Sequence, residues 1–299
     1  MSGEVLVDLH VHSLFSDGSD DLRSLVERAS SMGLSLLSVT DHDVTSHQAE
    51  ALSLSTSMGV RYLCGVEVSS EVESLGLGVH LLLYGFDPAS PAIADMEGKL
   101  KAYRAERNAA MLLRLKEMGL PVEMEEVRSI AGKELFGRPH LAEAMVRKGY
   151  AGSRREAFER YLRRGAPAYV PRRKLKPLEL SRVARESGAL LFWAHPCLDV
   201  PHDLLEEVAR RLREEGLDGI EAYSSYHDPL SVKRSLEVAS RLGLSVSGGS
   251  DYHGLYKGVS MGVRVPAHLL EWALELSLKA LSLEAGRASS PWSSGRRNR

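Results

Sequence analysis

Short apolar runs alternate with longer amphipathic segments, and this alternation constrains the fold more than any other feature of the chain. It is typical of a βα-repeated architecture, and about seven strand-like runs exclude a helical bundle. A barrel and an open wound sheet are both compatible with the pattern. The predicted strands cover residues 5–11, 34–40, 61–70, 79–85, 189–194, 219–223 and 245–248. The first two connecting helices are expected over residues 21–33 and 45–59.

The third and fourth predicted strands are separated by only a short connection, which predicts a β-hairpin between them. If the turn is centred near Gly76, His80 on the returning strand comes alongside Ser70. We therefore expect His80 to lie close to Glu67 on the outgoing strand.

Residues 91–176 interrupt the alternation, because they show helical patterns and loops but no convincing strand. Within them, residues 138–176 hold twelve Lys or Arg and three Glu, a local balance of +9 in a chain of net charge −2. We interpret this stretch as a small, mainly helical insertion with a basic face, although a solvated charged helix would have the same composition. The predicted division is a body of residues 1–90 and 177–286, an insertion of residues 91–176, and a disordered Ser-, Gly- and Arg-rich tail of residues 287–299.

The composition excludes several classes of protein. Lys and Arg number 38 against 40 Asp and Glu, so a globally basic nucleic-acid-binding surface is excluded. Two cysteines, Cys64 and Cys197, are too few for a disulfide scaffold or a four-cysteine zinc module. No apolar run approaches the roughly 20 residues that cross a bilayer, and the N-terminus lacks the pattern of a signal peptide. We expect a soluble, cytoplasmic protein with no membrane partner and no obligate protein partner.

Histidine and aspartate recur where predicted strands end. His10 and His12 close the first strand, and residues i and i+2 of a strand share a face, so both can hold one metal ion. A single His-x-His pair is equally compatible with a structural role. However, similar motifs follow at residues 41–43 (Asp-His-Asp), 194–196 (Ala-His-Pro) and 250–253 (Ser-Asp-Tyr-His). Polar groups placed repeatedly at strand ends are what an active site at the carboxyl edge of an α/β fold requires.

Glu67 is a carboxylate in an otherwise apolar strand, where burial is costly unless the group is paired or metal-bound. Exposure on an edge strand is the alternative. The candidate metal ligands are His10, His12, Asp17, His42, Glu67, His80, His195, Asp251 and His253. A catalytic ion takes about three protein ligands, so this set predicts two or three divalent ions; Mn²⁺, Fe²⁺ and Zn²⁺ suit it, and Cu(I) does not. The remaining helical histidines, His47, His202 and His268, are interpreted as surface or capping groups.

In this order, the motifs resemble the PHP (polymerase and histidinol phosphatase) superfamily over about residues 5–260. The resemblance rests on Asp-Leu-His-Val-His-Ser (8–13), Ser-Asp-Gly (16–18), Thr-Asp-His-Asp (40–43), Gly-Val-Glu (65–67), Ala-His-Pro (194–196) and Ser-Asp-Tyr-His (250–253). It implies an α/β fold, a distorted (β/α)₇ barrel, with a trinuclear metal site that hydrolyses phosphate esters. By motif, it implies His10, His12, Glu67 and Asp251 around one ion, Glu67, His80 and His195 around a second, and Asp17, His42 and His253 around a third.

Motifs in the predicted insertion indicate one branch of that superfamily. Gly-Arg-Pro-His-Leu-Ala (137–142) and Pro-Ala-Tyr-Val-Pro (167–171) resemble PHP proteins that act as 3′,5′-nucleoside bisphosphate phosphatases, whose relatives include 5′→3′ exonucleases on RNA. The resemblance implies that Arg138 and His140 bind a phosphate of a small nucleotide or of a short RNA 5′ end. His227 is a further candidate, either for a phosphate contact or for the acid that protonates the leaving group.

Two other functions remain open at this stage. A histidinol-phosphate-type phosphomonoesterase would use the same ligands, but its chemistry does not need a basic insertion. A non-catalytic, metal-stabilised module that binds nucleic acid or a protein would be expected to have lost ligands, whereas this set looks complete. We expect a metal-dependent phosphoric ester hydrolase that acts on nucleotides.

Overall fold

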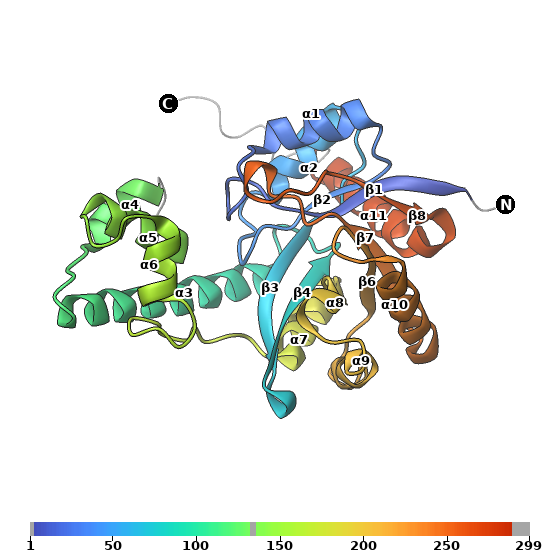
Figure 1. The fold of residues 1–299 in the computed structure, drawn as a ribbon. Coiled ribbons are helices and arrows are strands. Elements are labelled where there is room, and N and C mark those ends of the chain that lie inside the picture. Colours follow the sequence, from blue (N-terminus) through green and yellow to red (C-terminus); the bar gives the residue numbers. More distant parts are fainter. Residues whose placement is uncertain (1–2, 132–135, 289–299) are drawn as a thin grey trace, which may run out of the picture. The chain divides into compact units, whose positions relative to one another are not determined.

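The computed structural model describes residues 3–131 and 136–288 of a mixed α/β chain (Figure 1). Two compact units are present. The first, called the body, comprises Met1–Glu97 and Leu175–Arg299, and the second, called the helical unit, comprises Gly98–Lys174. Of the tail predicted to be disordered, residues 287 and 288 end the last helix, and residues 289–299 lie outside the described residues.

Three strands of the body form a small sheet in the order β2–β1–β8. β1 (Glu4–Val11) pairs in parallel with β2 (Leu37–Val39) and antiparallel with β8 (Val263–Pro266). β8 was not among the predicted strands, because four extended residues carry too little periodicity to be distinguished from a loop. The described residues therefore contain one strand more than the sequence pattern predicted.

The other five strands of the body form a second sheet in sequence order. Its two hairpin strands pair antiparallel with each other, and the second of them pairs antiparallel with the next strand. The last three strands are parallel. They are β3 (Gly65–Val72), β4 (Leu77–Tyr84), β5 (Leu190–Trp193), β6 (Gly219–Ser224) and β7 (Ser245–Gly249).

The predicted hairpin is present as β3 and β4, but its register differs by one residue from the prediction. The turn contains a short 3₁₀ segment followed by Gly76 at φ +63°, and His80 pairs with Ser69 rather than with Ser70. Directly opposed residues of antiparallel strands share a face, and so do residues 67 and 69. The observed register therefore places His80 on the same face as Glu67, which pairing with Ser70 would not do.

Helices connect most of the strands of the body. α1 (Leu22–Met32) begins at Asp21, whose side chain accepts a hydrogen bond from the N–H of Ser24, and ends at Gly33 in the left-handed conformation, as predicted. The others are α2 (Gln48–Ser57), the start of α3 (Pro91–Glu117), α7 (Pro177–Ser187), α8 (Pro196–Asp199), α9 (Leu205–Glu214), α10 (Pro229–Leu242) and α11 (Glu271–Ala288). None of the described helices is long and apolar enough to cross a membrane.

The two sheets of the body approach each other at two glycines. A Cβ on Gly65 would lie 2.2 Å from Oγ of Ser38, and one on Gly249 would lie 2.3 Å from Cβ of His10. Only glycine permits such close backbone approach. Isolated bridges also join the sheets, between Leu37 and Tyr62, His42 and Glu67, and Val11 and Tyr252.

Each unit has its own apolar core. In the body, both sheets contribute to one cluster, which includes Val7, Leu9, Leu36, Leu63, Leu82, Tyr84 and Phe192. The helical unit continues α3 and adds α4 (Met124–Ala131), α5 (Arg138–Arg147), α6 (Arg154–Ala157) and a π-helical turn at Phe158–Leu162. Its core includes Met111, Leu115, Val127, Phe136, Leu141, Met145 and Leu162, and its described residues contain no strand.

Candidate metal centre and arginine cluster

The end of β1 carries two histidines into a buried group of four side chains. The Nε2 atoms of His10 and His12 lie 3.3 and 3.2 Å from Oε2 of Glu67. They lie 3.4 and 3.1 Å from Oδ1 of Asp251. All four side chains are buried, and their ligand atoms are close enough together to hold one metal ion. This group is the one that the sequence motifs implied for the first ion.

Backbone hydrogen bonds bring these distant segments together. The N–H of Asp251 donates to the carbonyl oxygen of His10 at 2.8 Å, and the N–H of His12 donates to the carbonyl oxygen of Tyr252 at 2.9 Å. On the other side, the N–H of Glu67 donates to the carbonyl oxygen of Thr40 at 3.0 Å. The positions of the ligands are therefore fixed by main-chain pairing at the ends of strands.

A second group forms around the other oxygen of Glu67. Its Oε1 lies 3.1 Å from Nε2 of His195 and 3.3 Å from Nδ1 of His80. These two nitrogens are 3.3 Å apart. Glu67 thus belongs to both groups, with one oxygen in each, which is the arrangement of a carboxylate that bridges two ions.

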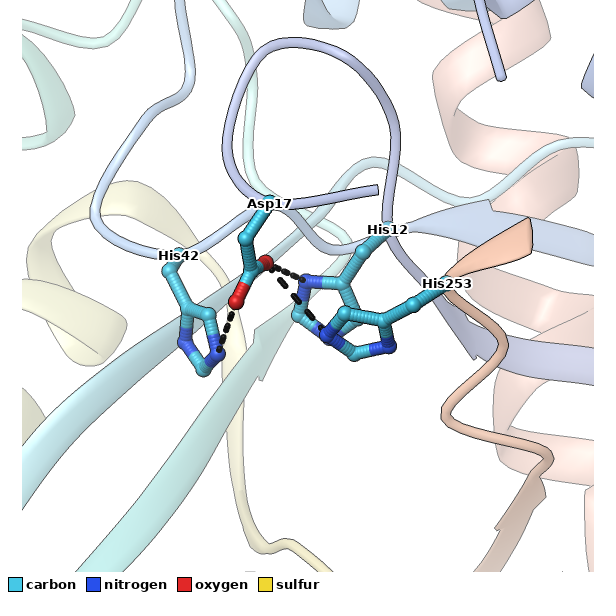
Figure 2. A group of neighbouring side chains, drawn as sticks. All are labelled: His12, Asp17, His42 and His253. Atoms are coloured by element: carbon cyan, nitrogen blue, oxygen red, sulfur yellow. Dashed lines mark ion pairs between the residues drawn. The ribbon is translucent and has the colours of Figure 1, made fainter. Parts of the chain in front are cut away.

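A third group surrounds Asp17, on the loop that follows β1 (Figure 2). Oδ1 of Asp17 lies 3.3 Å from Nε2 of His253 and 3.7 Å from Nδ1 of His12, and Oδ2 lies 3.9 Å from Nε2 of His42. The sequence motifs implied Asp17, His42 and His253 here, and the structure adds His12. The Asp17 side chain is 50% exposed, so this group is the one most open to solvent.

The donor atoms of these groups fit divalent cations. Several of them are buried and have no hydrogen-bond partner: Nε2 of His10, His12 and His253, Nδ1 of His42, Oε2 of Glu67 and Oδ1 of Asp251. Buried polar atoms in folded proteins are nearly always hydrogen-bonded, so a concentration of unpaired ones fits a binding site for cations. Imidazole nitrogen and carboxylate oxygen together suit Mn²⁺, Fe²⁺ or Zn²⁺.

The carboxylates of these groups are held in the charged form. Burial alone would raise the pKa of Glu67, but the imidazoles of His42 and His10 hold it well below its ordinary value. Burial also opposes ionisation of Asp251, whose pKa is nevertheless lowered by His10 and His12. Both side chains are therefore anionic near neutral pH, which is the form that binds a cation.

Three residues at these strand ends adopt a backbone conformation that normally favours glycine. His195 has φ +27°, Asp251 has φ +56° and Asp43, next to His42, has φ +61°. Each such residue costs on the order of 1–3 kcal/mol and persists only where surrounding structure enforces it. Two of the three residues are candidate ligands and the third is next to one, so the strained backbone positions lie at the candidate metal centre.

Glu221 on β6 was missed by the sequence analysis. It is fully buried, its Oε1 lies 3.1 Å from Nδ1 of His10, and its Oε2 accepts a hydrogen bond from the N–H of His195 at 2.7 Å. Because a carboxylate accepts but does not donate, His10 carries its proton on Nδ1 and presents Nε2 to the first group. Gly-Ile-Glu at 219–221 repeats the pattern of Gly-Val-Glu at 65–67, a signal that could have identified Glu221.

Asp41 organises the loop that carries Asp17. Its carboxylate accepts hydrogen bonds from the N–H and hydroxyl groups of Ser13 and Ser16 and lies 3.1 Å from Nε2 of His47. His47 was expected at the surface or as a cap. It stands at the N-cap position of α2, without a capping hydrogen bond from its side chain. It is 1% exposed rather than at the surface, because this carboxylate and the adjacent Gln48 give its ring polar contacts in the interior.

Both ring nitrogens of His227 have backbone partners. Nδ1 donates to the carbonyl oxygen of Ala222 at 2.8 Å, and Nε2 accepts a hydrogen bond from the N–H of Cys197 at 3.3 Å. Burial lowers the pKa of His227, so the ring is neutral near pH 7. This geometry ties the segment after β6 to α8.

In the helical unit, Arg138 and His140 lie in the first turn of α5. Nδ1 of His140 accepts a hydrogen bond from the N–H of Gly137 at 3.1 Å. The Arg138 guanidinium lies over the rings of Phe158 and Tyr169, at 5.1 and 5.6 Å from their centroids, and donates to a backbone carbonyl. Among the described residues, no carboxylate lies within ion-pair distance of Arg138.

A cluster of guanidinium groups surrounds Arg107 on α3. Burial, and then the charges of Arg172, Arg104 and Arg138, lower the pKa of Arg107 to about 9. Its Nε donates a hydrogen bond to Oδ1 of Asn108 at 2.9 Å. Four neighbouring arginines, called here the arginine cluster, are Arg104, Arg107, Arg138 and Arg172. Such concentrated positive charge is unfavourable by itself and favourable around an anion.

Comparison with known proteins places this geometry in a family. The PHP domain model matches residues 8–153. The phosphoribosyl 1,2-cyclic phosphate 1,2-diphosphodiesterase of Eggerthella lenta is 32% identical over 88% of this chain and 100% of that protein. The 3′,5′-nucleoside bisphosphate phosphatase of Chromobacterium violaceum is 32% identical over 84% of this chain and 88% of that protein. A Bifidobacterium adolescentis structure, described as a candidate metal-dependent phosphoesterase, matches with a TM-score of 0.75 and 28% identity, covering 90% of this chain and 95% of that one.

The α/β fold and the grouped histidines and carboxylates define a metal-dependent phosphoesterase. The chain belongs to the PHP-domain family, which confirms the resemblance seen in its motifs. It is accordingly a hydrolase of phosphoric esters rather than a non-catalytic module.

Proposed function

We propose that the chain hydrolyses a phosphate from small nucleotides, with 3′,5′-nucleoside bisphosphates as the preferred substrates. In this proposal the three groups of side chains in the body bind two or three divalent ions, and Mn²⁺, Fe²⁺ and Zn²⁺ are the candidates. Such ions supply Lewis-acid chemistry, which activates water as a nucleophile and offsets negative charge on the phosphate.

The residues of the body hold the reacting centre in place. Glu67 links the first and second groups, and His12 links the first and third, so the groups form one continuous site. Glu221 fixes the ring of His10, and Asp41 fixes the loop of Asp17. Such rigid support is what precise positioning of a phosphate for in-line attack requires. His227 has no part in this proposal, because both its ring nitrogens are engaged by the backbone.

One observation favours a substrate with two phosphates. Besides the carboxylate-rich groups of the body, the helical unit has the arginine cluster, with Arg138 flanked by aromatic rings. A guanidinium can grip a phosphate through two hydrogen bonds. We propose that Arg138 and His140 bind the phosphate that is not cleaved. A histidinol-phosphate-type monoesterase has no second phosphate for such a cluster to bind.

The test is phosphate release from matched substrates by the purified chain, loaded with Mn²⁺ or Zn²⁺ or treated with chelator. The panel contains adenosine 3′,5′-bisphosphate, adenosine 3′-monophosphate, adenosine 5′-monophosphate and histidinol phosphate. We expect metal-dependent release with the highest kcat/KM on the bisphosphate. Equal or higher kcat/KM on the monophosphates would contradict the two-phosphate proposal.

A second candidate substrate is a cyclic phosphate of a phosphoribosyl compound. The observation that favours it is the 32% identity to the Eggerthella lenta diphosphodiesterase over the full length of that protein. Such a substrate also carries two phosphate groups, but it lacks a nucleobase. Phosphoribosyl 1,2-cyclic phosphate and a short 5′-phosphorylated RNA are therefore added to the panel of substrates. Comparison of kcat/KM then distinguishes activity on cyclic phosphates or on RNA 5′ ends from activity on bisphosphates.

We also propose that the two sheets of the body form one distorted barrel. The bridges at Leu37–Tyr62 and His42–Glu67 support continuity between β2 and β3, and the Val11–Tyr252 bridge supports it between β1 and the segment after β7. The close approaches at Gly65 and Gly249 lie at the same two junctions. Replacement of either glycine by Val should therefore prevent folding of the body, as measured by circular dichroism.

A further inference from the structure

One cation reaches the ligand groups of the body. Nζ of Lys257 donates to Oδ2 of Asp251 at 2.6 Å. In the part of the chain that the structure describes, no other Lys or Arg forms an ion pair with any of the nine candidate ligands. Lys257 was not singled out from the sequence, because it lies in an irregular segment between β7 and β8 with no motif around it.

Asp251 divides its two oxygens between different neighbours. Oδ1 lies 3.1 and 3.4 Å from Nε2 of His12 and His10 and has no hydrogen-bond partner, whereas Oδ2 accepts from Lys257. The Asp251 side chain is 2% exposed and that of Lys257 is 37% exposed. The ammonium group therefore lies between a buried candidate ligand and solvent.

Tyr226 extends this feature toward the second ligand group. Nζ of Lys257 lies 5.8 Å from the centroid of the Tyr226 ring. The same ring stands perpendicular to that of His195, with centroids 6.4 Å apart. An ammonium and a phenol thus lie beside Asp251 of the first group and His195 of the second.

The backbone holds the segment of Lys257 in place. The N–H of Leu255 donates to Oγ of Ser19 at 2.9 Å, and Gly254 has φ +67°. A Cβ on Gly254 would lie 1.9 Å from the same Oγ, so only glycine allows this approach. The position of Lys257 is therefore fixed at its backbone while its four-carbon side chain keeps freedom to redirect the ammonium.

We propose that Lys257 contacts the phosphate group that reacts, leaving Oδ2 of Asp251 for a phosphate oxygen, with Tyr226 as a neighbouring hydrogen-bond donor. This inference rests on the proposed function, namely hydrolysis of a phosphate ester at the ligand groups of the body. The lysine ammonium is a mobile point charge that attracts a phosphate arriving beside Oδ2 of Asp251, in addition to any attraction from bound cations.

The experiment measures binding of inorganic phosphate to the metal-loaded protein by calorimetry, alongside bound metal per chain. The variants are Lys257→Met, Lys257→Arg and Tyr226→Phe, with Lys233→Met as the matched control, because Lys233 lies on α10 and is 72% exposed. We expect the phosphate Kd to rise about 10- to 100-fold in K257M, less in Y226F, and to stay near the wild-type value in K257R and K233M. Metal content should be the same in all five proteins.

Three results would overturn the inference: no binding of phosphate by the wild type, an unchanged Kd in K257M, or a K257M protein whose weaker binding is restored by added metal. The last result would mean that Lys257 supports ion binding instead. Failure of the proposed function has a different signature, namely a wild type that binds phosphate and hydrolyses none of the substrates in the panel.

Discussion

Oε1 of Glu221 lies 3.1 Å from Nδ1 of His10, while Oε2 of the same side chain accepts the N–H of His195 at 2.7 Å. One buried carboxylate on β6 thus orients one candidate ligand from each sheet of the body. The proton on Nδ1 of His10 directs the lone pair of Nε2 toward Glu67 and Asp251.

Glu221→Gln should weaken metal binding with little change in fold. Glutamine has the same size, but its amide NH₂ cannot accept, so the hydrogen bond to His10 or to the N–H of His195 is lost. Outer-shell changes of this kind typically reduce metal affinity about 10- to 100-fold. Titration of metal-free protein with Mn²⁺ or Zn²⁺ measures the effect. Glu237→Gln, at a partly exposed position on α10, is the control, and equal affinity in both variants would refute the role of Glu221.

Arg138→Ala should lower kcat/KM on a 3′,5′-bisphosphate roughly 30- to 1000-fold, which corresponds to a loss of about 2–4 kcal/mol in transition-state stabilisation. It should lower kcat/KM on monophosphates far less. The reason is that the variant leaves one substrate phosphate without its guanidinium partner. Arg163→Ala is the matched control in the same unit, because Arg163 is exposed and paired with Glu159. Equal losses on both classes of substrate would disprove a contact to a second phosphate.

Arg107→Met should separate stability from anion binding in the helical unit. The substitution keeps most of the aliphatic stem and removes a partly buried charge that lies beside Arg172, Arg104 and Arg138. Without anions, the variant should therefore be at least as stable as the wild type in thermal denaturation. Sulfate should raise the Tm of the wild type more than that of R107M. Identical sulfate responses would show that the arginine cluster binds no anion.

His227 should make the stability of the body depend on pH in a defined direction. Burial lowers the pKa of His227 in the folded chain below the ordinary value of 6.5, which applies to the unfolded chain. At a pH between the folded and the unfolded pKa, the unfolded chain therefore binds a proton that the folded chain does not. This contribution is present above pH 6.5 and is lost as the pH falls. The difference in unfolding free energy between wild type and His227→Asn should thus shrink from pH 7.5 to pH 5, as measured by urea denaturation. A difference independent of pH would contradict the neutral, backbone-bonded ring; the exposed His268→Asn serves as control.

Much of the candidate site could be predicted from the sequence because its ligands follow two local rules. His10 and His12 share a strand face by their spacing, and Asp251 and His253 follow an apolar run at the point where a strand must end. The structure brings these residues together in three groups. Two contain the residues that the sequence motifs implied, and the third contains His12 besides Asp17, His42 and His253.

The remaining features depend on tertiary structure. The register of His80 is set by the 3₁₀ turn before Gly76, and a local pattern does not fix such a turn to one residue. Arg107 resembles any other charged residue of a long helix, and only packing buries it among other arginines. The ion pair of Lys257 links an irregular segment to a strand end, which no periodicity encodes.

Stepwise reloading of chelator-treated protein with Mn²⁺ or Zn²⁺ tests metal-dependent phosphoester hydrolysis most directly. Bound metal per chain and phosphate release from adenosine 3′,5′-bisphosphate are measured on the same samples, with Asp251→Asn as the variant that lacks one carboxylate charge of the first group. We predict no activity without metal, activity that rises as more than one ion binds per chain, and weak binding with little activity in D251N. Full activity in metal-free protein would contradict the metal centre as the site of reaction.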